Sequence, residues 1–337
     1  MKNRKRFSMG QLIDGAWHTS DNINAKSDGS FQRPDSAFRN WVTEDGSAGQ
    51  TGEGGFAAEP GRYHLYVSWA CPWAHRALIF RKLKRLEDVI SASVVDWFMG
   101  EDGWEFTTRD GATPDPIMGA RYLRDVYTAA RPDFTGRVTV PVLWDRKRGS
   151  IVSNESSEII RMFNSAFDAF TDAKADYYPA PLRARIDAIN ERVYASVNNG
   201  VYRCGFAGSQ QAYDTAFGEL FASLDWLEDI LSKNRYLAGE TLTEADWRLF
   251  TTLVRFDAVY VGHFKCNLRR IDDYEHLPNY LRELYQMPGI AETVNMFHIK
   301  NHYYRSHESI NPRRIVPGGP ELDYTTSHNR DRLKKVA

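Results

Sequence analysis

Residues 68–76 read SWACPWAHR, and this stretch decides how the rest of the chain is interpreted. It follows a short apolar run, His64 to Val67, which predicts a strand, and it opens a helical pattern from Arg76 to Leu86. Pro72 suits the first turn of a helix because an N–H group has no intrahelical partner there. Cys71 is therefore expected at a helix N-terminus, where free amide groups and the helix dipole stabilise a thiolate. We expect Cys71 to ionise near neutral pH and to act as a nucleophile.

The fourth position of this turn is Ala74, where a dithiol oxidoreductase carries its second cysteine. A dithiol enzyme resolves its own mixed disulfide, and this chain cannot do so locally. A site with one thiol needs an external thiol, which in the cytosol is usually glutathione. The other two cysteines, Cys204 and Cys266, lie in helical or aromatic surroundings, and we expect them to be packing residues.

The composition excludes several classes of protein. The chain has 337 residues, enough for two domains, and its net charge of -1 argues against nucleic acid or an anionic membrane as a partner. Three widely spaced cysteines form no disulfide framework and indicate a reducing compartment. No apolar run reaches the roughly 18 residues of a membrane span, and no apolar segment follows the basic start to make a secretory signal. We expect a cytoplasmic protein.

The first half of the chain has a thioredoxin-like order of elements. Residues 1–60 are polar and rich in glycine, and we expect an irregular N-terminal extension that wraps the body. A domain over residues 61–170 follows, with a strand, a helix and a second strand at its start. A long insertion at about 97–136 shows no sustained period. The elements expected around it are strands at Val89–Asp96, Val138–Asp145 and Arg148–Val152, and a helix that Ser153–Ser157 caps and that runs to about Phe163.

The second half of the chain is helical. We expect an all-α domain over residues 176–310, with Thr243 as the N-cap of one helix in a capping box with Asp246. An extended tail follows over residues 311–337, and we expect its last residues to be loose. The helical patterns cover Leu182–Asn198, Gln210–Ser232, Glu244–Val259, Leu277–Gln286 and Ile290–Arg305.

A thioredoxin-like half followed by an all-helical half resembles the glutathione transferase superfamily. The motif Cys-Pro-Trp-Ala, together with NNGVY at 198–202 and HIKNHYYRSH at 298–307, resembles its Xi class, the glutathionyl-hydroquinone reductases. The Ile310-Asn311-Pro312 and Gly319-Pro320 segments of the tail match that class as well. The resemblance covers roughly residues 35–325. It implies an α/β thioredoxin-like N-terminal domain, an all-helical glutathione-transferase C-terminal domain and a homodimer.

The resemblance also implies a glutathione site. Pro141 resembles the cis-proline of such sites, at which Val140 pairs with the cysteinyl backbone of glutathione; the alternative is a proline at a sheet edge. Glu155 and Ser156 begin a helix, where backbone amides hold a carboxylate and Glu155 takes an ammonium group, a role compatible with helix capping. The remaining glutathione contacts are implied to be Trp104 and Arg137, the latter opposite the glycyl carboxylate.

Three tyrosines are implied on the substrate side. Tyr202 and Tyr303 correspond to the class's tyrosines that contact the hydroquinone hydroxyl and help to move a proton, and Tyr304 is the alternative to Tyr303. Core packing is the alternative role for each. His298 and His302 stand at i, i+4, a metal-ligand spacing, but no third ligand cluster is visible. We expect no metal and no permanently bound cofactor, and we expect these histidines to cap, to hydrogen bond or to position Tyr303.

The reaction implied is the reduction of an S-glutathionyl-hydroquinone, held between the domains, which uses two glutathione units: the one on the substrate and a second, free molecule. Cys71 attacks the glutathionyl sulfur, and a second glutathione releases oxidised glutathione. Two alternatives stay open. An omega-like thioltransferase or dehydroascorbate reductase would use the same cysteine without needing the tyrosines. A non-catalytic scaffold with this fold would have no use for an activated thiol.

Overall fold

The computed structural model describes residues 10–19 and 26–333, which form two compact units. The first contains residues 10–19, Pro34–Ala175 and Thr293–Val316, and the second contains residues 26–33, Asp176–Glu292 and residues 317–333. The basic start of the chain and its final residues, which we expected to be loose, lie outside the described residues. Within the described part of the chain, no helix combines the length and the apolar character needed to cross a membrane.

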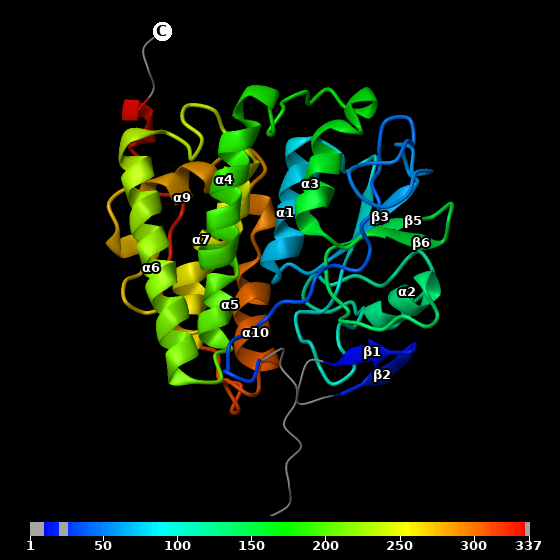
Figure 1. The fold of residues 1–337 in the computed structure, drawn as a ribbon, viewed down its shortest axis with the longest axis horizontal. Helices are drawn as coiled ribbons and strands as arrows, with labels where there is room; N and C mark the ends of the chain where they lie inside the picture. Colours follow the sequence, from blue (N-terminus) through cyan, green and yellow to red (C-terminus); the bar gives the residue numbers. More distant parts are fainter. Residues whose placement is uncertain (1–9, 20–25, 334–337) are drawn as a thin grey trace, which may run out of the picture. The chain divides into compact units, whose positions relative to one another are not determined.

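The first unit is built on a mixed sheet with the strand order β4-β3-β5-β6 (Figure 1). β3 (Tyr63–Val67) is buried along its whole length and pairs in parallel with β4 (Ser91–Val94). β5 (Val142–Asp145) pairs antiparallel with β3 and with β6 (Ser150–Ser153). The expected strand from Val138 is thus shorter at its start, because Pro141 has no N–H group to donate to a ladder. Burial on both faces explains why β3 does not alternate between apolar and exposed polar residues.

Three helices complete the thioredoxin-like arrangement. α1 (Pro72–Leu83) connects the parallel strands β3 and β4 and packs against α3 (Ser156–Ser165), beside the sheet in Figure 1. α2 (Leu123–Ala130) contacts β6, and its position inside the expected irregular insertion at 97–136 corrects that expectation. Its three buried residues follow the spacing i, i+3, i+4, which is too little for a helical pattern to stand out among glycine, proline and aspartate. They are Leu123, Val126 and Tyr127.

The N-terminal extension is less irregular than we expected. β1 (Gln11–Ile13) and β2 (Ala16–His18) form a hairpin through Asp14 and Gly15, both with positive φ. Asp-Gly is the signature of a two-residue hairpin turn, which the glycine-rich composition of the extension obscured. A Cβ atom on Gly15 would lie 2.0 Å from the carbonyl oxygen of Pro132, so that only glycine fits there. The expectation of a wholly irregular extension is therefore wrong for residues 11–18.

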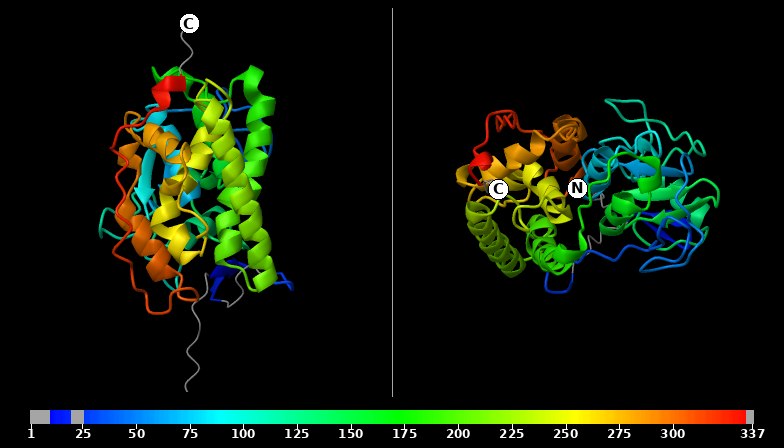
Figure 2. Two further views of the ribbon diagram at one scale, coloured as in Figure 1. Left: turned by 90° about the vertical axis from the view of Figure 1, so that its left-hand side faces the viewer. Right: turned by 90° about the horizontal axis from the view of Figure 1, so that it is seen from above.

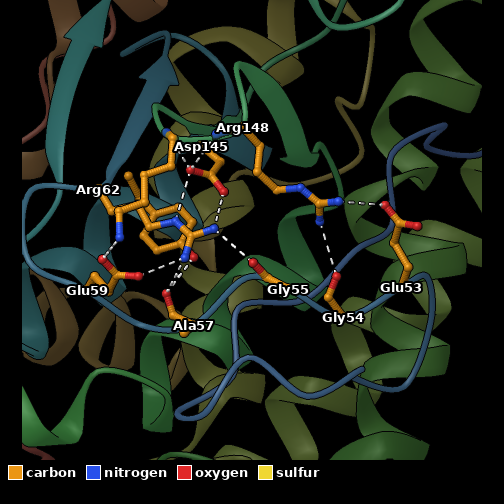
Figure 3. A network of polar contacts seen from close by, with 10 residues as sticks. Glu53, Gly54, Gly55, Ala57, Glu59, Arg62, Asp145 and Arg148 are labelled. Carbon is orange, nitrogen blue, oxygen red and sulfur yellow. Dashed lines mark hydrogen bonds and ion pairs between the residues drawn. The ribbon is translucent and has the colours of Figure 1, made fainter.

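Residues 38–61 wrap the sheet, as we expected for this part of the extension. The Asn40 amide donates to the Val152 carbonyl at 2.9 Å, which places the extension along β6. Figure 3 shows how the following loop is held by Arg62, which binds Asp145 at the end of β5 and the carbonyl oxygen of Gly55. Arg62 is 8% exposed and Asp145 is fully buried, so the pair lies in the interior. This buried ion pair fixes the extension to the sheet that carries the candidate site.

His64, the second residue of β3, makes the first unit sensitive to acid. Its Nδ1 lies 2.7 Å from the Ser91 hydroxyl and its Nε2 lies 2.9 Å from the Ser93 hydroxyl. Burial, helped by the charge of Arg146, lowers the pKa of His64 to about 4. The unfolded chain binds this proton below about pH 6.5, whereas the native protein does not until about pH 4, so stability falls as the pH falls through that window.

We expect acidification from pH 7 to 4 to cost about 3 kcal/mol of the free energy of unfolding through His64. His64→Gln, which does not titrate, should lose that part of the pH dependence although it is less stable at pH 7. Urea midpoints of both proteins at pH 7, 5.5 and 4.5 test this. Parallel declines in the two proteins would contradict the assignment.

The second unit is helical, and the helices follow the sequence pattern closely. Thr243 and Asp246 form the predicted capping box at the start of α7 (Glu244–Arg255). α6 (Gln210–Lys233), the long yellow-green helix of Figure 2, runs alongside α5 (Gly200–Gly205) and packs against it. The expected continuous helix Leu182–Asn198 is α4 followed by a π-helical turn at Tyr194–Asn198. The other helices of this unit are α4 (Arg183–Val193), α8 (Val261–His263) and α9 (Leu277–Tyr285).

α10 (Met296–Ser306), which we expected within the all-α domain, packs in the first unit. His298 Nε2 donates to the Asp110 carbonyl at 2.7 Å, and the Ser306 hydroxyl accepts from the Met99 amide at 3.0 Å. The helix begins later than Ile290 because Ala291–Thr293 forms a separate 3-10 turn and Asn295 caps the helix itself. α10 thus belongs to the same compact unit as Cys71.

Candidate functional site

Cys71 occupies the N-cap of α1, as the sequence predicts. Pro72 is the first helical residue, and the Cys71 carbonyl accepts from the His75 amide at 3.0 Å. The side chain of Cys71 makes no capping bond and is half-buried, so the thiol stands at the positive end of the helix. Its Sγ donates to the carbonyl oxygen of Val140 at 3.5 Å. The arrangement presents an accessible thiol in a setting that favours a thiolate.

The bond between Val140 and Pro141 is cis, as we expected. The residues lie just before β5, and Val140 is 4% exposed. The contact with the Cys71 thiol places the Val140 backbone at the nucleophile. Val140 and Cys71 are therefore neighbours in space although they are 69 positions apart in the chain.

The start of α3 forms a second part of the site. Glu155 is the N-cap, and its carboxylate accepts from the Ser157 amide at 3.0 Å and from the Ser36 hydroxyl at 2.9 Å. Burial alone would raise the pKa of Glu155, but these hydrogen bonds and the charge of Arg76 lower it below its ordinary value. The buried Ser156 hydroxyl accepts from Arg76 Nη1 at 3.4 Å, which links α3 to the helix that starts at Cys71. Capping and anion binding use the same groups here, so one role does not exclude the other.

Trp104 and Arg137 lie on either side of α2 in the chain. The Trp104 ring is stacked on the His302 ring of α10, with centroids 4.8 Å apart and planes inclined by 21°. Arg137 Nη1 donates to the carbonyl oxygen of Gly10 at 3.1 Å, and burial lowers the pKa of this guanidinium. Trp104 is thereby tied to α10, and Arg137 to the start of the N-terminal hairpin.

The two tyrosines on α10 are both buried. Tyr303 is 1% exposed and has its ring edge-to-face with those of His302 and His307, at 5.5 and 5.4 Å between centroids. Tyr304 is 8% exposed, and burial raises its pKa. Its carbonyl oxygen accepts from Asn311 Nδ2 at 2.7 Å, which anchors the tail. Burial does not choose between the two phenols, and the Tyr303 ring contacts the rings of His302 and His307.

His298 and His302 face backbone carbonyls, which only accept hydrogen bonds. His298 Nε2 therefore carries a proton towards the Asp110 oxygen, and His302 Nδ1 carries one towards the Trp97 oxygen at 2.9 Å. Burial lowers the pKa of His298. No group of three or more His, Cys, Asp or Glu side chains suited to a metal ion occurs in the described ranges 10–19 and 26–333.

Tyr202 belongs to the second unit, near the middle of α5. Its ring lies in an aromatic cluster, 5.4 Å from Phe264, 6.2 Å from Phe206 and 6.2 Å from Tyr260 between centroids. Cys204 on the same helix is 3% exposed and Cys266 is fully buried, which agrees with the packing role expected for both. Burial raises the pKa of Cys266 well above its ordinary value, so it does not compete as a nucleophile.

Comparison with known proteins assigns the chain to a family. Models of the glutathione S-transferase N-terminal and C-terminal domains match residues 70–166 and 210–283. The glutathionyl-hydroquinone reductase YqjG of Escherichia coli is 59% identical over 324 residues, which are 96% of this chain and 99% of YqjG. This chain belongs to the glutathionyl-hydroquinone reductase family. PcpF of Sphingobium chlorophenolicum, another glutathionyl-hydroquinone reductase, is 54% identical over 312 residues, or 93% of this chain and 96% of PcpF.

Solved structures of this reductase family have the same fold. The glutathione-bound structure of YqjG matches with a TM-score of 0.89 and 57% identity, covering 96% of this chain and 99% of that one. The Xi-class glutathione transferase from Natrialba magadii matches with a TM-score of 0.91 and 52% identity, covering 96% and 98%. The predicted class and the predicted thioredoxin-like and helical halves are thus confirmed.

Three residues that contact predicted site residues within their own unit have no role that the sequence indicates. Arg76 lies in the opening motif, but its contact with Ser156 depends on how α1 and α3 pack. Ser36, which donates to Glu155, lies in an extension without a helical or strand pattern. Tyr260, beside Tyr202, lies in a π-helical turn at Phe256–Tyr260 that the sequence pattern merges with α7. None of these contacts leaves a local sequence signal.

Proposed function

We propose that this protein reduces S-glutathionyl-hydroquinones to hydroquinones at the expense of glutathione. The observation that carries the proposal is the half-buried Cys71 thiol at the N-cap of α1, beside Val140, in a chain 59% identical to a named glutathionyl-hydroquinone reductase. A single nucleophilic thiol with Ala74, rather than a second cysteine, at the fourth position of its turn suits exchange with glutathione. Glutathione is the co-substrate, and the reaction needs no permanently bound cofactor.

Glutathione is held by the residues of the first unit. The Val140 backbone pairs with its cysteinyl residue, next to the Cys71 sulfur. The Glu155 carboxylate takes the α-ammonium group, a role that the lowered pKa of Glu155 supports because the acceptor must be ionised. The first-turn amides of α3 and the Ser156 hydroxyl take the adjacent carboxylate. Arg137 offers its charge to the glycyl carboxylate, and Trp104 is the remaining contact.

The chemistry proceeds in two steps. In the first, the hydroquinone tautomerises: a hydroxyl gives its proton to a tyrosinate, and the ring carbon that bears sulfur takes a proton from solvent water. The Cys71 thiolate then attacks the glutathionyl sulfur, a sulfur–sulfur bond forms, and the carbon–sulfur electrons pass into an enolate. Return of the proton from tyrosine to the enolate oxygen gives the hydroquinone. Tyr303 and Tyr202 are assigned to these proton transfers.

The second step regenerates the enzyme. A glutathione thiolate attacks the glutathionyl sulfur of the Cys71 disulfide, Cys71 leaves as a thiolate, and oxidised glutathione is released. The balance is one glutathionyl-hydroquinone and one added glutathione consumed, with one hydroquinone and one glutathione disulfide formed. Ping-pong kinetics follow from the covalent intermediate.

The proposal is tested by incubating the protein with a glutathionylated hydroquinone and glutathione and separating the products by liquid chromatography. Free hydroquinone and oxidised glutathione should appear in equal amounts. Hydroxyethyl disulfide is the comparison substrate, since a thioltransferase needs only a disulfide. Turnover of the disulfide without cleavage of the thioether would favour the omega-like thioltransferase instead, and turnover of neither would favour a scaffold.

Tyr303→Phe should slow hydroquinone release by about 100-fold, because positioned proton transfer contributes factors of about 10² to 10⁴. Exchange with hydroxyethyl disulfide should stay at the wild-type rate, since it moves no proton on carbon. Tyr304→Phe is the matched control on the same helix, about 100° away. Both rates are measured for each variant. If hydroquinone release is lost only in Tyr304→Phe, the proton-transfer role belongs to Tyr304 instead.

We propose further that the protein acts as a homodimer in the cytoplasm. The resemblance to the glutathione transferase superfamily supports the dimer, and three cysteines among 337 residues, none in a disulfide, suit a reducing compartment. Light scattering on the purified full chain tests the dimer.

A further inference from the structure

Residues 26–33 form a strap on the second unit, seen in blue near α5 in Figure 1. The strap is fixed where α5 ends and α6 begins. The Gly208 amide donates to the Gly29 carbonyl at 2.8 Å, and the Ser209 hydroxyl donates to the Asp28 carbonyl at 2.8 Å. Gly29 has a φ of +83°, and a Cβ atom there would lie 2.8 Å from the Ser209 amide nitrogen. Since Ser209 is also the N-cap of α6, the strap is joined to a fixed point of the helical unit.

The strap covers Tyr202 with an aromatic ring and a cation. The Phe31 ring, 8% exposed, is stacked on those of Phe206 and Tyr202 at 5.5 and 6.5 Å. The guanidinium carbon of Arg33 lies 4.7 Å from the Tyr202 ring centroid. Arg33 Nε also donates to Asn199 Oδ1 at 3.0 Å, and Asn199 is the N-cap of α5. The guanidinium is thus held at both the helix start and the phenol ring.

This position has a chemical consequence. A cation over the face of an aromatic ring is attracted to it, and the attraction grows when the ring carries the negative charge of a phenolate. A guanidinium stays charged at every pH at which an enzyme works. The bond to Asn199 holds the Arg33 guanidinium in this position over the Tyr202 ring.

We propose that Arg33 is a positioning residue for Tyr202: it holds the phenol ring against α5 and favours the tyrosinate that accepts a proton from the hydroquinone. The inference rests on the proposed function for the reaction that it serves. It gives the strap a role that neither its composition nor its sequence pattern indicates. The glutathione site of the first unit does not depend on it.

The direct test is carbon NMR of the full chain labelled at tyrosine Cζ, with the Tyr202 resonance assigned from Tyr202→Phe. Arg33→Gln should move the titration midpoint of Tyr202 up by roughly half to one pH unit. Arg33→Lys keeps the charge and should recover part of the shift. Arg33→Met keeps the apolar stem over the rings and should raise the Tyr202 midpoint by the same amount. It takes the place of Arg33→Gln if that variant fails to fold.

Arg192→Gln is the matched control. Arg192 belongs to the same unit, lies 4.2 Å over the Trp226 ring and donates through Nε to the Ser223 hydroxyl, so its removal costs the same two kinds of contact. It should leave the Tyr202 midpoint unchanged. A midpoint that is the same in wild type, Arg33→Gln and Arg33→Met would overturn the proposal.

Kinetics separate this inference from the proposed function. In Arg33→Gln the kcat of hydroquinone release should fall by about threefold to tenfold, with the KM for glutathione unchanged, and the rise of kcat with pH should move up with the Tyr202 midpoint. Wild-type kcat and pH profile despite a raised midpoint would overturn the role of Arg33. Wild-type turnover in Tyr202→Phe would instead contradict the function proposed for Tyr202.

Discussion

Cys71→Ala should lower the rate of hydroquinone release by about 10⁴-fold or more. Loss of a nucleophile that forms a covalent intermediate removes the whole pathway, and losses of this size or larger are typical. Cys71→Ser should be equally inactive, because a hydroxyl at the N-cap of α1 is not ionised near neutral pH. Product chromatography measures the rate, and mass spectrometry of the wild type after reaction with the glutathionylated hydroquinone, without added glutathione, should find one glutathione on Cys71.

The same prediction has a chemical readout that does not depend on turnover. The native protein should react with one equivalent of iodoacetamide at pH 7, because Cys204 and Cys266 are buried and burial raises the pKa of Cys266. Unfolding in guanidinium should expose all three thiols. Cys204→Ala is the matched control and should keep its activity and its single reactive thiol. A Cys71→Ala protein with wild-type turnover would refute the mechanism.

The parts of this site that the sequence predicts are those encoded locally. Two adjacent residues, Cys71 and Pro72, mark the N-terminus of α1, and another adjacent pair, Glu155 and Ser156, marks that of α3. The helical half is predicted for a similar reason. α6 shows the helical spacing of apolar residues over 24 residues, and Thr243 and Asp246 mark the start of α7. Each of these features depends on neighbours in the chain.

The parts that the sequence does not predict depend on packing between distant segments. Arg33 and Asn199 are 166 positions apart, and His302 meets the Trp97 carbonyl across 205 positions. α2 escaped prediction because eight residues hold only two turns of pattern. α10 shows the same limit in another form, since its sequence is plainly helical but does not reveal that it packs with the first unit.

Asp145→Ala should destabilise the protein by about 3 to 5 kcal/mol, which is typical when one partner of a buried ion pair is removed. Asp145 is fully buried, and the side chain of its partner Arg62 is 6% exposed, so the substitution leaves a guanidinium in the interior with Glu59 as its remaining carboxylate. The Lys147 amide also loses its acceptor, Asp145 Oδ1, at 2.8 Å. Urea unfolding followed by circular dichroism measures the change in midpoint.

Asp172→Ala is the control for this prediction. Asp172 pairs with Arg85 at 2.7 Å, but the two side chains are 74% and 70% exposed, and exposed pairs contribute little. Its midpoint should equal that of the wild type. The site of proteolytic cleavage also distinguishes the two variants. In Asp145→Ala, limited proteolysis should first cut residues 53–61, which Arg62 holds through Gly55 and Glu59. Equal midpoints for the two variants would show that the interior pair contributes no more than the exposed one.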